Sequence, residues 1–301
     1  MSYSGHKTTC IGQCIYWITL LHLVTGLLLT TTSLFTGDDH WVKYFFDLQS
    51  PLFLLTFSGL GLCLSAIAWW QFGTGESMRW AWLLITVASW CRFVGLTIIH
   101  VFGTTPGEGH GSVFPAARLD GVALLQLGHA VSGPIHMLVL AVGLLVVLGT
   151  YRRFGMLIQF STTDYALFGF VSAFTIYRLF EWSLWLVKPD NPVSFYETAK
   201  WFTDPLLCVL LFEAVFIRRA VLNMGWGLVA KCWGGFTAAI LITLIGNVGS
   251  WAATHGYLAM PVVSLFWITW CLAIAAYALG PAYQVEATLR ARERLRNFVA
   301  A

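Results

Sequence analysis

Charged residues are scarce in this sequence, and their scarcity excludes most classes of soluble protein. Lys, Arg, Asp and Glu make up 10% of the 301 residues, against about 25% in an average soluble domain. Hydrophobic residues make up 58% of the chain, and the mean hydropathy is +0.73. So few charges cannot cover a core of this size with a water-soluble surface. The composition predicts an integral membrane protein whose partner is the lipid bilayer, and no nucleic-acid partner is expected.

The signatures of several enzyme classes are also missing. The chain has no phosphate-binding glycine loop, no HExxH, no aspartate-rich prenyl-diphosphate motif and no Gly-x-Ser-x-Gly turn. Its seven cysteines are an odd number and lie mostly in apolar runs, so we expect no disulfide framework. No small-residue cleavage site follows the first apolar run, which is therefore expected to remain as a spanning helix. An enzyme is less expected than a non-enzymatic function.

Eight long apolar runs are present instead, separated by turns rich in glycine, proline and aspartate. A helix of about 20 apolar residues crosses the roughly 30 Å hydrocarbon layer of a membrane. We therefore predict an all-α bundle of about eight transmembrane helices. The sixth run is the weakest of these predictions, because it is short and contains two acids. The predicted spans are 14–35, 51–72, 80–102, 120–149, 165–187, 200–217, 231–254 and 262–283.

The distribution of charge predicts the orientation of these spans. Basic residues concentrate on the cytoplasmic side of membrane proteins. With both termini inside the cell, eleven of the 17 Lys and Arg residues fall in cytoplasmic segments and four in outer segments. Acids show the opposite trend, and Asp204 is counted among those at the outer side. We predict a multi-pass protein of the inner (cell) membrane with both ends in the cytoplasm.

The chain changes character near its C-terminus. Residues 1–283 are expected to form one membrane-embedded helical domain. Residues 284–301 contain four arginines among Leu289, Leu295 and Phe298. This pattern is typical of a short basic amphipathic helix, which we expect to bind the anionic inner leaflet or a protein partner.

Two neighbouring hairpins, 80–149 and 165–217, resemble each other. Each places one arginine, Arg92 or Arg178, about halfway along its first span. Both hairpins run the same way through the membrane. The sequence therefore allows a parallel internal repeat, and coincidence between two leucine-rich hairpins is the alternative.

Four charged residues are expected deep in the bilayer: Arg92, Arg178, Glu181 and Glu213. A charge at the bilayer centre costs about 2.5–3.5 kcal/mol on insertion scales, so such residues face the bundle interior and find partners. Arg178 and Glu181 are three residues apart and can pair on one helix. Glu213 could be met by Arg218 or by Arg92. We expect either a bracing polar network or a site for a small ion, and the two arginines favour an anion.

Four histidines also lie in spans: His22, His100, His129 and His136. Imidazole is a common axial ligand of b-type haem. By depth, His22 could pair with His136 and His100 with His129. The stretch from Trp17 to His22 faintly resembles the first helix of membrane cytochromes b, over about twenty residues. The alternative is that these histidines bond across helix seams, as the small residues Gly128 and Ser132 suggest.

Three kinds of function follow from these residues. The first is a transporter or a membrane protein that binds a small ligand or ion at the charged centre. The second is a redox subunit that carries haem b on the four histidines. The third is a sensory or scaffolding subunit that contacts a partner through its tail. The sequence favours the first, because buried charges cost the most to retain.

Overall fold

The computed structural model is built of helices throughout the part of the chain that it describes, with no strand there. This confirms the all-helical prediction for those residues. The described residues are 10–38, 40–102, 121–154, 160–188, 195–222, 227–258 and 260–300.

Ten α-helices and three short π-helical segments follow one another in these residues. The π-helical segments, labelled η, each adjoin an α-helix and continue it. In chain order the elements are α1 (Cys10–Thr36), α2 (His40–Tyr44), η1 (Phe45–Gln49), α3 (Ser50–Gln71), α4 (Ser77–Thr97), η2 (Ile98–Phe102), α5 (Gly121–Ala130), η3 (Val131–Ile135), α6 (His136–Arg153), α7 (Thr162–Leu186), α8 (Phe195–Leu222), α9 (Leu228–Thr254) and α10 (Met260–Ala300).

Every predicted span coincides with helix, but the helices differ in how apolar they are. Within the described ranges, six segments are long and apolar enough to cross a membrane by their length and composition, which indicates a multi-pass membrane protein. Helices α7 and α8 have 25 and 28 residues, yet they carry charged side chains and are not among the six. The six segments are 11–36, 40–71, 77–102, 123–153, 228–253 and 268–299.

The chain groups into two compact units. Unit 1 comprises residues 1–71 and 226–301, and unit 2 comprises residues 72–225. In unit 1, helix α10 packs against α9, α3 and α1. Helices α9 and α10 touch through glycines, because a Cβ on Gly235 would lie 2.9 Å from the backbone nitrogen of Gly280. Trp233 and Phe236 are fully buried and fill the core beside this contact.

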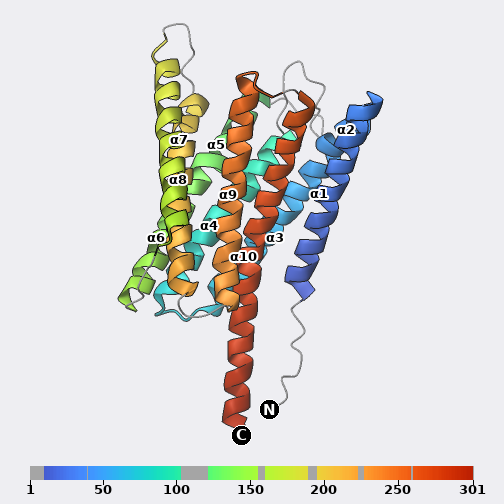
Figure 1. The fold of residues 1–301 in the computed structure, drawn as a ribbon. Helices are drawn as coiled ribbons and strands as arrows, with labels where there is room; N and C mark the ends of the chain where they lie inside the picture. The colour runs from blue at the N-terminus through green and yellow to red at the C-terminus, as the bar shows by residue number, and fades with distance from the viewer. Residues whose placement is uncertain are drawn as a thin grey trace. The chain divides into compact units, whose positions relative to one another are not determined.

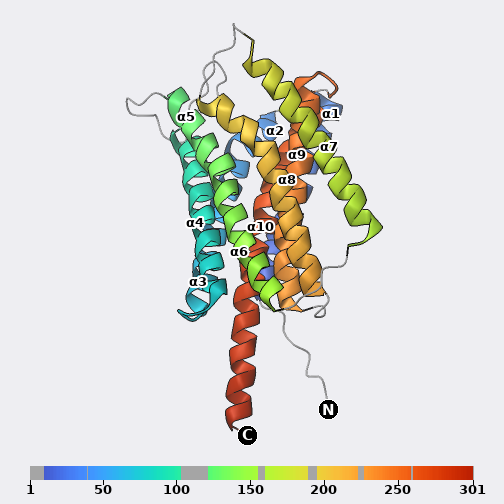
Figure 2. The same ribbon diagram turned by 90° about the vertical axis from the view of Figure 1, so that its left-hand side faces the viewer.

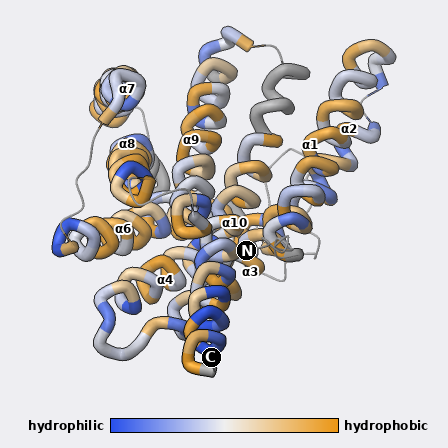
Figure 3. Tube along the Cα trace, turned by 60° about the horizontal axis from the view of Figure 1, so that its bottom comes forward, coloured by the Kyte–Doolittle hydropathy of each residue, from blue (hydrophilic) through white to orange (hydrophobic). Residues whose placement is uncertain are grey.

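Helix α10 extends beyond the other helices of its unit (Figure 1). Its final turns are mostly hydrophilic (Figure 3), and Leu295 and Phe298 are exposed there. Arg292 donates a hydrogen bond of 2.8 Å to the carbonyl of Gln71, at the end of α3. A guanidinium at a helix C-terminus satisfies a free carbonyl and complements the helix dipole. The basic segment therefore continues α10 as one helix, and binding of lipid or a partner by it stays a prediction.

In unit 2, α6 packs between α4 and α8, and α7 packs against α8 (Figure 2). Helix α4 meets α5 and η3 at very short range, since a Cβ on Gly95 would lie 2.5 Å from the Ser132 nitrogen and 2.7 Å from the Gly128 oxygen. The small residues around His129 thus form a close helix seam, as their spacing predicted.

The helix that contains this seam is interrupted. Gly133 has non-helical φ and ψ of −98° and −106°, and Pro134 follows it inside η3. Proline has no N–H and cannot continue the hydrogen-bond ladder of a helix. The result is a break between α5 and α6, opposite the end of α4. Such π-helical breaks often occur at functional sites.

Candidate functional site

The four charged residues predicted to form a site all lie in unit 2, but they do not form one cluster. Arg178 and Glu181 lie on α7, Glu213 on α8 and Arg92 on α4. Arg178 and Glu181 contact each other directly. Arg92 contacts a histidine of α6. Glu213 is hydrogen-bonded to none of the other three.

Arg178 is held between two carboxylates. Its Nη1 donates to Glu181 on the next turn of α7, and its Nε donates to Oδ2 of Asp204 on α8 at 3.1 Å. The guanidinium also lies over the ring of Trp182, 5.5 Å from the ring centroid. The Arg178–Glu181 pair confirms the predicted i,i+3 contact. This triad connects α7 to α8 by charge-assisted hydrogen bonds, which are stronger than neutral ones.

Asp204 is the member of this triad that the sequence analysis missed. From the sequence it counts only among the acids at the outer side. It is 9% exposed and bonded to Arg178, so it belongs to the buried polar groups. A signal was present in the sequence, because Asp204 lies inside the predicted span 200–217. Pairing α7 with α8 in the correct register requires the tertiary structure.

Glu213 is the most unusual acid of unit 2. It lies in the middle of α8 and is 4% exposed. Neither carboxylate oxygen has a hydrogen-bond partner in the part of the chain that the structure describes. The predicted contacts with Arg218 and Arg92 are therefore not formed. An ionised carboxylate that is buried without a partner is costly, so this group must be neutral or must hold a cation.

Arg92 is bonded to a histidine rather than to the predicted acid. Its Nη1 lies 3.5 Å from Nε2 of His136, and His136 Nδ1 lies 2.8 Å from the carbonyl oxygen of Ala88. A carbonyl only accepts, so Nδ1 carries the proton and Nε2 is left as the acceptor for the guanidinium. Both ring nitrogens of His136 are thereby engaged, and its side chain is 1% exposed. The contact joins α4 to α6 just below the helix break.

His100 and His129 are the predicted histidine pair that the fold brings together. His100 lies in η2 and His129 at the end of α5, and these two elements pack against each other. Both flank the glycine seam. No group of three or more His, Cys, Asp or Glu side chains that could hold a metal ion occurs among the described residues.

His22 lies on α1, in unit 1. Its ring stacks between Phe45 and Phe53, with centroid distances of 4.7 and 4.1 Å. Its Nε2 is buried without a hydrogen-bond partner within the described chain. The predicted pair of His22 and His136 therefore has one member packed between aromatic rings and the other bonded to Arg92. Ligation of haem by these two stays a prediction.

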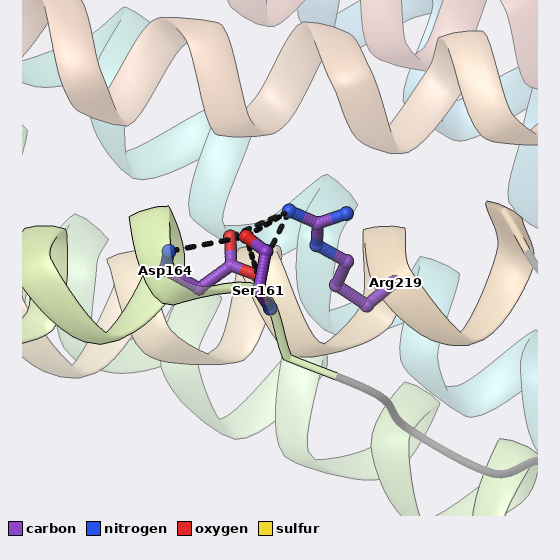
Figure 4. Close-up of polar contacts among 3 residues, drawn as sticks. All are labelled: Ser161, Asp164 and Arg219. Atoms are coloured by element: carbon purple, nitrogen blue, oxygen red, sulfur yellow. Dashed lines mark hydrogen bonds and ion pairs between the residues drawn. The ribbon is translucent and has the colours of Figure 1, made fainter.

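A second ion pair closes the other end of the α7–α8 contact (Figure 4). Ser161 and Asp164 form a reciprocal capping box at the start of α7. Arg219 of α8 donates to Oδ1 of Asp164 and to Oγ of Ser161, both at 2.9 Å. Burial alone raises the pKa of Asp164, but the hydrogen bonds from Arg219 and Ser161 outweigh it and lower the pKa below its usual value. Asp164 precedes the predicted span 165–187.

Among the side chains of α7 and α8 that the structure describes, four acids (Asp164, Glu181, Asp204 and Glu213) outnumber three arginines (Arg178, Arg218 and Arg219). One guanidinium, that of Arg178, faces Glu181 and Asp204, and Glu213 adds a third carboxyl group along α8. Asp164 and Arg219 neutralise each other. Such an excess of acid attracts cations rather than anions.

In comparisons with known proteins, the chain matches no family model, no curated protein and no solved structure.

Proposed function

We propose that this protein binds and moves a small cation through the membrane at a polar centre between α7 and α8. In this proposal α7 and α8 also cross the inner membrane, which gives eight spans with both termini in the cytoplasm. The observation that carries it is the acidic excess buried on these two helices. A cation therefore takes the place of the anion that the two arginines favoured in the sequence analysis.

Three features support a transport role over simple bracing. A bracing network needs one acid for each arginine. Here Arg178 contacts two acids, and Glu213 has no arginine as a hydrogen-bond partner. Intramembrane acids frequently mark ion pathways and proton relays. The broken helix at Gly133 also places irregular backbone inside the unit, as occurs where transporters coordinate ions.

Flux in proteoliposomes tests the proposal. Purified protein is reconstituted, and uptake of protons, Na⁺ and K⁺ is followed under an imposed gradient. We expect cation flux in the wild type and a large decrease in the Asp204→Asn variant, because that change removes a buried charge of the centre. Glu293→Gln is the matched control, since Glu293 is exposed on the C-terminal part of α10. The proposal would be refuted if liposomes with the wild-type protein took up none of these cations faster than protein-free liposomes.

Haem binding is the second candidate, and it is favoured by the packing of η2, which carries His100, against α5, which carries His129. In this reading the two imidazoles ligate one b-type haem at the seam between η2 and α5. Absorption spectra of the purified protein, oxidised and dithionite-reduced, decide the matter. Sharp reduced bands that disappear in His100→Ala and His129→Ala would establish it, and a colourless protein from haem-replete cells would exclude it.

A further inference from the structure

The buried acids of unit 2 differ in how they are neutralised. Asp164 is bonded to Arg219, and Asp204 is bonded to Arg178. Glu213 is buried as deeply as either, and neither of its oxygens has a hydrogen-bond partner in the described chain. Burial of an unpaired carboxylate costs several kcal/mol, whereas the protonated acid carries no net charge to desolvate. The surroundings of Glu213 thus select the neutral form.

The groups on α7, which packs against α8, are committed to other partners. Arg178 is shared by Glu181 and Asp204. Asp164 is bonded to Arg219, which lies six residues after Glu213 on α8. None of these side chains offers Glu213 a counter-charge.

The titratable and charged groups described on α5 and α6 also form no hydrogen bond with Glu213. His136 is bonded to Ala88 and lies beside Arg92. Arg152 and Arg153 are exposed at the end of α6. His129 lies at the end of α5, which packs against η2. No ion pair connects Glu213 to any of them, or to Arg218 on its own helix.

The identity of the cation follows from the number of ligands. A metal cation such as Ca²⁺ takes six to eight oxygen ligands and Mg²⁺ takes six. Glu213 supplies one carboxyl group, and the described chain holds no group of three acidic, His or Cys side chains that could complete a metal site. A proton needs a single oxygen. It is therefore the cation that this site can bind without further ligands.

We propose that Glu213 is a reversible proton-binding site and that the cation moved by this protein is the proton. Binding converts the carboxylate to the carboxylic acid, and release to either side of the membrane returns it. This proposal rests on the proposed cation transport and names its substrate. Asp204 and Glu181 are bonded to Arg178 and hold α7 against α8 while Glu213 changes its protonation.

Infrared spectroscopy of the full-length protein in lipid nanodiscs observes this proton directly. A protonated carboxylic acid has a C=O stretching band that the carboxylate lacks. We expect such a band in the wild type, lost as the pH is raised and absent from Glu213→Gln. The glutamine variant should fold as well as the wild type, because it replaces the neutral acid with a neutral group of the same shape. Glu293→Gln on α10 should leave the band unchanged.

Proton flux in proteoliposomes is the second measurement. Glu213→Gln should reduce flux to the level of protein-free liposomes, while Glu293→Gln should not change it. A spectrum in which the wild type and Glu213→Gln show the same bands at every pH would overturn the proton site. So would a band whose presence depends on Na⁺ at constant pH, because a metal cation would then be the guest.

The two proposals can fail separately. If no cation crosses wild-type liposomes but the Glu213 band still titrates, cation transport is wrong and the proton site stands. If wild-type liposomes carry protons and Glu213→Gln carries them equally well, transport stands and the assignment to Glu213 is wrong. A melting curve of Glu213→Gln in detergent establishes that the variant is folded in each case.

Discussion

Replacing Arg178 with methionine would remove the shared partner of Glu181 and Asp204 and keep most of the side-chain volume. The side chains of Arg178 and Asp204 are 15% and 11% exposed, so their contact is close to the buried limit. Breaking a buried pair by deleting one partner costs about 3–5 kcal/mol, because it leaves a charge without compensation. We expect Arg178→Met to lower the melting temperature by roughly 10 °C, given a few degrees per kcal/mol.

Smaller changes at the same triad should cost less, in an order that the geometry sets. Glu181 is 26% exposed, and its removal leaves Arg178 paired with Asp204. Glu181→Gln should therefore cost about 1 kcal/mol, near the upper end for exposed ion pairs. The combination Arg178→Met, Glu181→Met and Asp204→Asn removes all three charges and should recover most of the stability lost in Arg178→Met.

Melting curves of the detergent-solubilised protein provide the assay. Arg294→Met, on the exposed C-terminal part of α10, is the matched control and should melt like the wild type. The reasoning fails if Arg178→Met melts at the wild-type temperature. It also fails if the triple variant is no more stable than Arg178→Met, since stranded charge would not then explain the loss.

Two further predictions concern the ends and the seam of unit 2. Because the pKa of Asp164 is lowered in the folded protein, its contribution to stability is complete above the usual aspartate pKa of about 4 and is lost as the pH falls through the lowered value. In a plot of melting temperature against pH, Asp164→Asn should remove the decrease at low pH that Asp164 causes. The same decrease in the variant as in the wild type would contradict this role of Asp164. Gly95→Ala should destabilise the protein, because its Cβ would lie 2.5 Å from the Ser132 nitrogen, whereas Gly149→Ala should not, since nothing lies within 4 Å of a Cβ there. Equal melting temperatures for the two glycine variants would show that the seam is not close-packed.

The sequence predicted those features of this protein that depend on composition and on neighbours along one helix. A hydrophobic content of 58% with few charges indicates a membrane protein whatever the fold. The eight predicted runs lie in helices where the structure describes them, and six of these helices are long and apolar enough to cross a membrane. A helix suits such a run because a backbone in hydrocarbon must satisfy its hydrogen bonds within each segment. The Arg178–Glu181 pair could also be predicted, because i,i+3 spacing places two side chains on the same face of a single helix.

The tertiary structure alone decided how the remaining polar groups are matched. Asp204 reaches Arg178 because α8 packs against α7 in one particular register, and Arg92 reaches His136 because α4 packs against α6. That Glu213 has no hydrogen bond from Arg92 follows from the same packing. Partners on different helices are determined by which faces meet and at what depth, and the small residues and helix breaks that control this leave only a weak signal in the hydrophobic pattern.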